Sequence, residues 1–196
     1  DDRKALLLTN AHPHDFVIVA DSLGFNFADA TASGQLTILE YATFIPEENA
    51  SQNIMLPPDA FDELQETVER EAIQRIAFDT ILPWVTIQPV SRVQQHVYSF
   101  CHAIDRLGAT TLFTMPKPVS NAAFSLRHAV ESFCPVAIEL HHHGETAPFA
   151  LSVTKYLGEG ANISTRFPFH IEPGHGLVAG NVPAPATAPA PAAPHF

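Results

Sequence analysis

An aspartate at the end of a short apolar run is the residue whose setting in this sequence suggests chemistry most directly. The run covers Arg75 to Phe78, and Asp79 and Thr80 follow it. Such a run predicts a buried parallel strand that ends at the carboxyl edge of a sheet, where open α/β sheets place their ligands. A carboxylate there can hold Mg²⁺ through a hydroxyl or a water. The plainer alternative is an aspartate that only caps the turn after the strand.

Histidines form the second candidate group. In a strand, the first and third of the three consecutive histidines at 141–143 would share a face, at a spacing that suits two imidazole ligands. Apart from Glu145, they lack a nearby third ligand. A polar hairpin tip is the simpler interpretation. His12 and His14 flank Pro13 at the start of a predicted helix, where solvent-exposed histidines are more common than a base or ligand. No nucleophile-elbow motif is present, so we predict no Ser-His-Asp triad.

The elements that must position these residues alternate between strand and helix. Apolar runs predict strands at 5–8, 36–41, 75–78 and 110–114, and helical patterns follow them from 13, 59, 91 and 121. The first helix should bury Phe16, Val19, Ala20 and Leu23, and the third should open with a Ser91–Gln94 capping box. Four such alternations predict an α/β fold with a mostly parallel sheet flanked by helices. We expect 75–78 and 110–114 to be inner strands, with helices over both faces.

The pattern changes after residue 135. Strands are predicted at 136–142, 149–157 and 166–171, separated by short turns, which indicates an antiparallel hairpin extension. From residue 181 the sequence is proline and alanine with almost nothing to bury. We therefore predict one folded domain over 1–178 and an extended tail or linker over 179–196.

Composition limits the possible functions. The chain has 196 residues, 46% of them hydrophobic, and a net charge of −11 with only ten lysines and arginines. The charge argues against a nucleic-acid partner, since binding phosphates needs clustered cations. No stretch reaches the ~20 apolar residues of a membrane span. The two cysteines, Cys101 and Cys134, have neither metal nor disulfide spacing, so a reducing cytoplasm is expected. The sequence begins at Asp1, not at a methionine, which is compatible with a trimmed chain.

Several short motifs occur in the order in which one known family carries them. They are DSLGFNF at 21–27, GQLTIL at 34–39, RIAFDT at 75–80, LGATTLF at 107–113, VTKYLG at 153–158 and the stretch 169–176. Together they resemble the KaiC-like branch of the RecA-type ATPases over residues 4–178. The resemblance implies a RecA-like fold in which RIAFDT is the Walker B strand. It also implies a nucleotide and magnesium site, here vestigial, that includes Asp79, Thr80, Thr114 and Lys155.

The family's catalytic parts are incomplete in this sequence. No G-x-x-x-x-G-K-[ST] loop occurs in it, and in the family that loop lies just upstream of where this chain begins. The first strand ends in Thr9 and Asn10 where the family has glutamates that activate water. Leu157 stands where the resemblance implies an arginine that would reach a neighbour's γ-phosphate.

These losses predict a domain that does not hydrolyse ATP and works as a protein-interaction, assembly or regulatory module. Its expected partners are copies of itself or a related RecA-like subunit, with no cofactor unless an upstream loop supplies ATP and Mg²⁺ binding. The alternative is a KaiC-like ATPase involved in signal transduction whose phosphate loop lies upstream of residue 1. Regulation by nucleotide binding without turnover is a third hypothesis, which also depends on upstream sequence.

Overall fold

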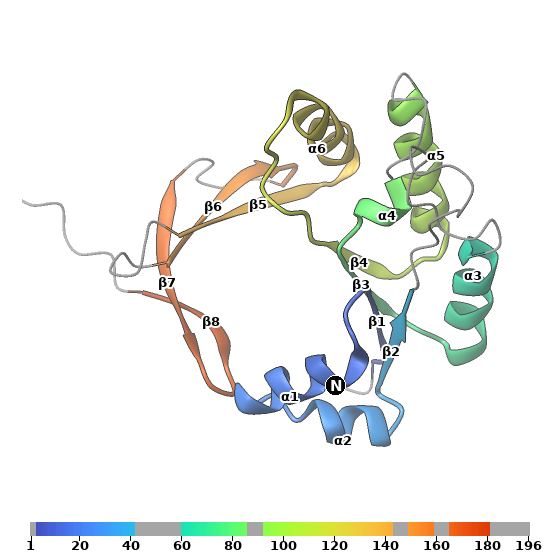
Figure 1. The fold of residues 1–196 in the computed structure, drawn as a ribbon, viewed down its shortest axis with the longest axis vertical. Coiled ribbons are helices and arrows are strands. Elements are labelled where there is room, and N and C mark those ends of the chain that lie inside the picture. The colour runs from blue at the N-terminus through green and yellow to red at the C-terminus, as the bar shows by residue number, and fades with distance from the viewer. Residues whose placement is uncertain (1–2, 42–59, 86–91, 143–148, 159–164, 181–196) are drawn as a thin grey trace, which may run out of the picture. The chain divides into compact units, whose positions relative to one another are not determined.

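The computed structural model describes residues 3–41, 60–85, 92–142, 149–158 and 165–180 (Figure 1). The chain divides into two compact units, residues 1–135 and 136–196. The first unit contains β1 (Ala5–Thr9), α1 (Pro13–Ser22), α2 (Phe27–Ala32), β2 (Leu36–Glu40), α3 (Ala60–Glu71), β3 (Arg75–Asp79), α4 (Leu82–Val85), α5 (Val93–Arg106), β4 (Thr110–Phe113) and α6 (Asn121–Phe133). The second contains β5 (Val136–His141), β6 (Phe149–Tyr156), β7 (Arg166–Glu172) and β8 (Gly176–Ala179).

The first unit is built on a four-stranded parallel sheet in the order β2-β1-β3-β4. The α/β fold and the flanking helices predicted from the sequence are therefore confirmed. β3 is an inner strand as predicted, between β1 and β4. The same prediction for β4 is wrong for this sheet, because β4 lies at its edge and the next strands along the chain pair in a sheet of their own.

Helices cover the two faces of the parallel sheet unequally. Leu6, Ile76 and Phe78 lie on one face and are at most 2% exposed, packed with side chains from α3, α5 and α6. Figure 1 shows α3, α4 and α5 gathered on one side of the strands, apart from α1 and α2. Burial of these strand residues was the critical test of the predicted fold, and it is confirmed.

The opposite face is only partly covered. Leu7, Ala77 and Leu112 line an apolar groove of about 300 Å³, which also receives Phe27 of α2. α1 begins after the N-cap His12 and ends before Gly24, which adopts a positive φ of 81°. Of the four residues predicted to form its buried face, only Ala20 is buried, and Val19 is 57% exposed. The prediction for that face is wrong because α1 contacts α2 and β2 without entering the core.

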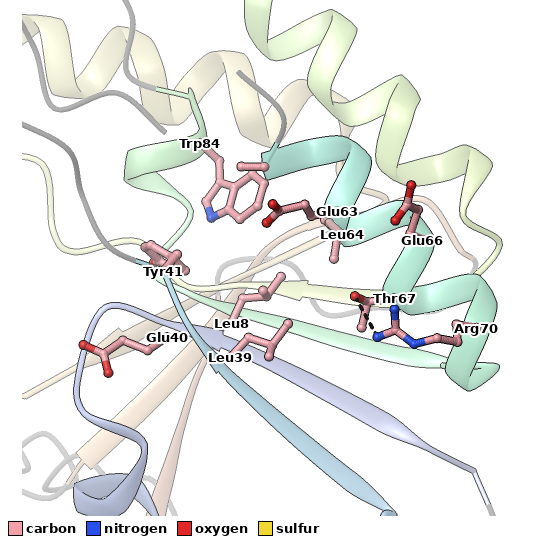
Figure 2. A pocket seen from close by; sticks show the side chains of 11 residues that line it. Leu8, Leu39, Glu40, Tyr41, Glu63, Leu64, Glu66, Thr67, Arg70 and Trp84 are labelled. Carbon is pink, nitrogen blue, oxygen red and sulfur yellow. Dashed lines mark hydrogen bonds between the residues drawn. The ribbon is translucent and has the colours of Figure 1, made fainter. Parts of the chain in front are cut away.

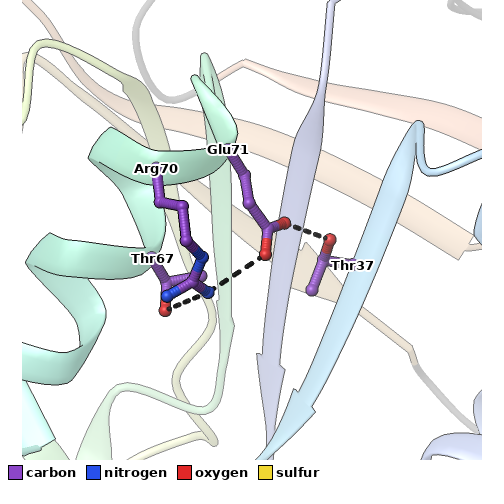
Figure 3. A network of polar contacts seen from close by, with 4 residues as sticks. All are labelled: Thr37, Thr67, Arg70 and Glu71. Atoms are coloured by element: carbon purple, nitrogen blue, oxygen red, sulfur yellow. Dashed lines mark hydrogen bonds and ion pairs between the residues drawn. The ribbon is translucent and has the colours of Figure 1, made fainter.

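A polar network joins the end of α3 to β2 (Figure 3). Thr37 Oγ1 donates a hydrogen bond to Glu71 Oε2 at 2.9 Å, and Arg70 Nη2 contacts Glu71 Oε1 at 3.2 Å and Thr67 Oγ1 at 3.4 Å. These hydrogen bonds, first Thr37 and then Arg70, lower the pKa of Glu71. The network fixes the helix end against the sheet.

The second unit is an antiparallel sheet in the order β5-β6-β7-β8, as the short turns predicted. Its pairing places apolar side chains of β5 and β6 on one face, as in the pairs Ile138–Val153 and Leu140–Leu151. A register shift between Ala137 and Ile138 interrupts the first pairing. Several of the apolar side chains are exposed, including Ile138 at 57% and Leu140 at 62%.

Several predicted features lie outside the described residues, namely Asp59, Ser91, His143, Glu145 and the tail from residue 181. Three short elements were not predicted: α2, α4 and β8. Within the described ranges, no helix has the length and apolar character that crossing a membrane requires.

Candidate functional site

Three of the four predicted site residues meet at the carboxyl edge of the parallel sheet. Asp79 ends β3, and Thr114 follows β4, its neighbour in the sheet. Thr114 Oγ1 donates a hydrogen bond to Asp79 Oδ1 at 2.6 Å. Thr80 Oγ1 donates to the carbonyl oxygen of Thr114 at 2.9 Å, and the peptide bond between Asp79 and Thr80 is cis. One carboxylate and two hydroxyls thus lie together at this edge.

Tyr41 belongs to this cluster, although the sequence predicts it only as the last residue of a strand. Its hydroxyl donates a hydrogen bond to the carbonyl oxygen of Thr80 at 2.7 Å, and its backbone N–H donates to the carbonyl oxygen of Thr9 at 2.9 Å. Burial, with a smaller contribution from the negative charge of Asp79, raises the pKa of the Tyr41 hydroxyl to about 12. Tyr41, which directly follows β2, therefore holds the turn after Asp79 through its hydrogen bond to Thr80.

The end of β1, between β2 and β3, provides a hydroxyl in place of a base. Thr9 is fully buried, and its Oγ1 accepts a hydrogen bond from the Ala11 N–H at 3.0 Å. In the strand register Thr9 pairs with Asp79 on one side and with Glu40 on the other. Because a threonine hydroxyl is not a base near neutral pH, this position cannot activate a water as a carboxylate would.

The fourth predicted site residue, Lys155, lies on β6 in the second unit, opposite Ala137 of β5. The structure therefore brings Asp79, Thr80 and Thr114 together within one unit and places Lys155 in the other. Leu157, which stands where the family resemblance implies an arginine, follows β6 and is 73% exposed.

The oxygen atoms around Asp79 fit one part of a magnesium site. Mg²⁺ prefers oxygen ligands and keeps several waters, so a single carboxylate with adjacent hydroxyls can hold it when a phosphate completes the shell. The described ranges contain no glycine-rich loop that would cradle that phosphate. By itself this edge therefore fits a hydrated cation and lacks the groups that bind a triphosphate.

The described histidines form a hydrogen bond, a ring stack and a helix cap. His141 Nε2 lies 2.8 Å from Ser152 Oγ, and the His142 ring stacks on Phe149 with 4.6 Å between centroids. His12 caps α1 by accepting a hydrogen bond from the His14 N–H. In the part of the chain that the structure describes, no group of three or more His, Cys, Asp or Glu side chains is arranged to hold a metal ion.

Comparisons with known proteins agree with this architecture. The KaiC ATPase family model matches residues 2–181. A crystal structure of the KaiC-like protein PH0186 from the hyperthermophilic archaeon Pyrococcus horikoshii OT3 matches with a TM-score of 0.62 and 17% identity, over 91% of this chain and 76% of that chain. A comparison with curated proteins found no match. The family match spans nearly the whole chain and includes the Asp79 edge, so the chain belongs to the KaiC ATPase family.

Proposed function

We propose that this KaiC-family domain does not hydrolyse ATP by itself and acts through protein contacts, as an assembly or regulatory module. The observation that carries the proposal is Thr9 at the end of β1. Its hydroxyl is buried and is not a base near neutral pH, so Thr9 cannot take a proton from an attacking water.

The exposed apolar surface of the second unit supports the protein-contact half of the proposal. Ile138 and Leu140 share one face of β5 and are 57% and 62% exposed. Contiguous exposed apolar patches mark protein interaction sites, whereas single exposed apolar residues are common on any surface. We propose a homo-oligomer or an assembly with a related RecA-like subunit in the cytoplasm, with no nucleic-acid or membrane partner.

An ATPase assay with a binding measurement tests the proposal. We expect no phosphate release above buffer with Mg²⁺ and ATP, and no ATP-dependent rise in melting temperature. Ligand at about 100 times its dissociation constant would stabilise the fold by about 2.7 kcal/mol, which a thermal scan detects readily. The Asp79→Asn variant is the matched control. The proposal would be overturned if the wild type hydrolysed ATP and the Asp79→Asn variant did not.

A second candidate is an ATPase whose phosphate loop lies upstream of residue 1. The open edge of β4 favours it, since among the described residues no strand pairs with that edge, and Leu112 is 63% exposed beside the apolar groove. A further strand and helix from another segment could pair with β4 and cover the groove. ATP binding by a longer chain that includes the upstream residues, but not by residues 1–196, would select this candidate.

Assembly is tested separately by light scattering on the chain with and without residues 181–196. We expect an oligomer in both cases, held through the folded domain and not through the tail. A monomer in both cases would remove the assembly proposal. A monomer only after the deletion would move the contact to the tail.

A further inference from the structure

A pocket of about 430 Å³ is lined by residues of β1, β2, α3 and α4 in the first unit, and Asp79 is not among them (Figure 2). Its apolar wall is formed by Leu8, Leu39, Leu64 and the rings of Tyr41 and Trp84. The volume is in the range that small-molecule sites occupy. An apolar wall with a few polar groups is also the usual composition of such sites.

A buried hydrogen-bond donor in this wall has no acceptor. Trp84 is 6% exposed, and its Nε1 is the one buried side-chain polar atom without a hydrogen-bond partner among the described residues. In Figure 2 the nitrogen edge of the indole faces Tyr41 and Leu8, which line the pocket with it. The Tyr41 hydroxyl is used by the Thr80 carbonyl and does not satisfy the indole. A buried unsatisfied donor is costly, so this position favours a ligand that brings an acceptor.

The pocket is bordered by more negative than positive charge. Glu40, Glu63 and Glu66 line it, and Arg70, the cationic side chain among its described lining residues, already contacts Glu71 and Thr67. Glu63 is in the first turn of α3, where a carboxylate also complements the helix dipole. Glu40 and Glu66 lie outside that turn, so the dipole does not account for all three carboxylates.

We propose that this pocket binds an organic cation that has a short apolar chain and a carbonyl oxygen. The carbonyl accepts the Trp84 N–H, the chain packs on the leucines, and the cationic head faces Glu63 and Glu66. A guanidinium or ammonium group next to an amide has this chemistry, either in a free small molecule or in a basic side chain of a protein. Binding here would also contact Tyr41, which holds the turn after Asp79.

Trp84 provides a direct readout because it is the only tryptophan in the chain. The probe is N-acetyl-arginine methylamide, titrated into the full chain at low salt. We expect saturable changes in Trp84 fluorescence and a downfield shift of its single indole N–H resonance, as a new hydrogen bond forms. N-acetyl-norleucine methylamide keeps the carbonyl and the apolar chain without the charge, and should bind at least tenfold more weakly.

Substitutions on α3 separate the proposed site from general charge effects. The Glu63→Gln/Glu66→Gln double variant should raise the dissociation constant of the arginine probe at least tenfold. Glu69→Gln removes a charge from the same helix at a residue that does not line the pocket, and should leave binding within about twofold. A stationary indole resonance at saturating probe, or equal binding of the neutral probe, would overturn the proposal.

A capped Ala-Ala-Arg-Ala-Ala peptide distinguishes the two sources of the ligand. Binding as tight as that of the single capped residue would assign the pocket to a protein side chain, and exclusion of the peptide would assign it to a free small molecule. Both results support the proposed chemistry. None of these measurements involves ATP turnover, so their failure would leave the proposed function untouched.

Discussion

The Tyr41 hydroxyl reaches past β1 to donate a hydrogen bond to the Thr80 carbonyl, so that a residue following β2 holds the turn following β3. Tyr41→Phe removes this bond while keeping the ring. A neutral hydrogen bond contributes about 0.5–1.5 kcal/mol, so the free energy of unfolding should fall by that amount in urea titrations. Tyr98→Phe, at a tyrosine that is 51% exposed, is the control. Equal losses in the two variants would show that the bond to Thr80 contributes nothing specific.

The Tyr41 hydroxyl should also make the free energy of unfolding depend on pH in the alkaline range. The pKa of Tyr41 is raised from 10.0 to about 12, so folding favours its neutral form. This contribution to stability is complete below pH 10 and is lost as the pH rises from 10 through 12. A rise of this size corresponds to about 2.7 kcal/mol, which solvent screening of the half-buried ring reduces to about 1 kcal/mol. The stability difference between the wild type and Tyr41→Phe should therefore shrink over this range in urea titrations. A constant difference would contradict the raised pKa.

The bond between Thr114 and Asp79 can be tested with a pair of substitutions. Thr114→Val removes the hydroxyl at nearly constant volume and should cost about 1 kcal/mol in the free energy of unfolding. Thr114→Ser keeps the donor and should recover most of the loss. Thr110→Val, at the other end of β4 and also exposed, controls for valine in this strand. If serine and valine were equivalent at 114, the hydroxyl would have no role in stability.

Phe78 should be the most sensitive position of the core near the site. It is fully buried and contacts the rings of Trp84, Phe100 and Phe113. Phe78→Ala should lower the free energy of unfolding by about 3–5 kcal/mol, through lost burial and the cavity left behind. Phe124→Ala, on the exposed side of α6, should change it by no more than about 0.5 kcal/mol. Circular dichroism during urea unfolding measures both.

The pKa of Glu71 tests the network that fixes α3 to β2. Thr37→Val removes the largest cause of its lowered pKa, so the value should rise toward that of an ordinary glutamate in carboxylate NMR titrations. Thr31→Val should leave the pKa unchanged, because Thr31 bonds only to backbone carbonyls of α2. Because the folded-state pKa is lowered, the stability from Glu71 is present above the unfolded-state pKa and is lost as the pH falls through the folded-state value.

The sequence predicted the elements whose pattern is long or strongly apolar. The run before Asp79 and the amphipathic helices α3, α5 and α6 are examples, because their burial follows from periodicity alone. The four-residue helix α4 and the six-residue α2 are too short for a period to be visible. For α1 the periodicity was present, but the face that it predicts is solvent-exposed at Val19.

At the candidate site, the strand-end position predicted Asp79 as a site residue, and the family resemblance added Thr80 and Thr114. Tyr41 lies at a strand end too, but its role depends on reaching past an intervening strand, which the linear sequence does not encode. The unpartnered indole of Trp84 also has no sequence signature, since its environment is assembled from β1, β2 and α3. The Tyr41–Thr80 bond and the surroundings of the Trp84 indole both depend on how β1 and β2 pair in the sheet.

The position of β1 inside its sheet has a consequence for biosynthesis. β1 is translated before both of its neighbours, yet it pairs with β2 on one side and with the much later β3 on the other. Until β3 has left the ribosome, Leu6 and Leu8 have no complete core to enter. Such non-local pairing slows folding and leaves apolar strands exposed to aggregation. The nascent segment around β1 should therefore stay without its complete core until β3 emerges, and substitutions in β3 should lower the yield of folded protein in cells more than its equilibrium stability would suggest.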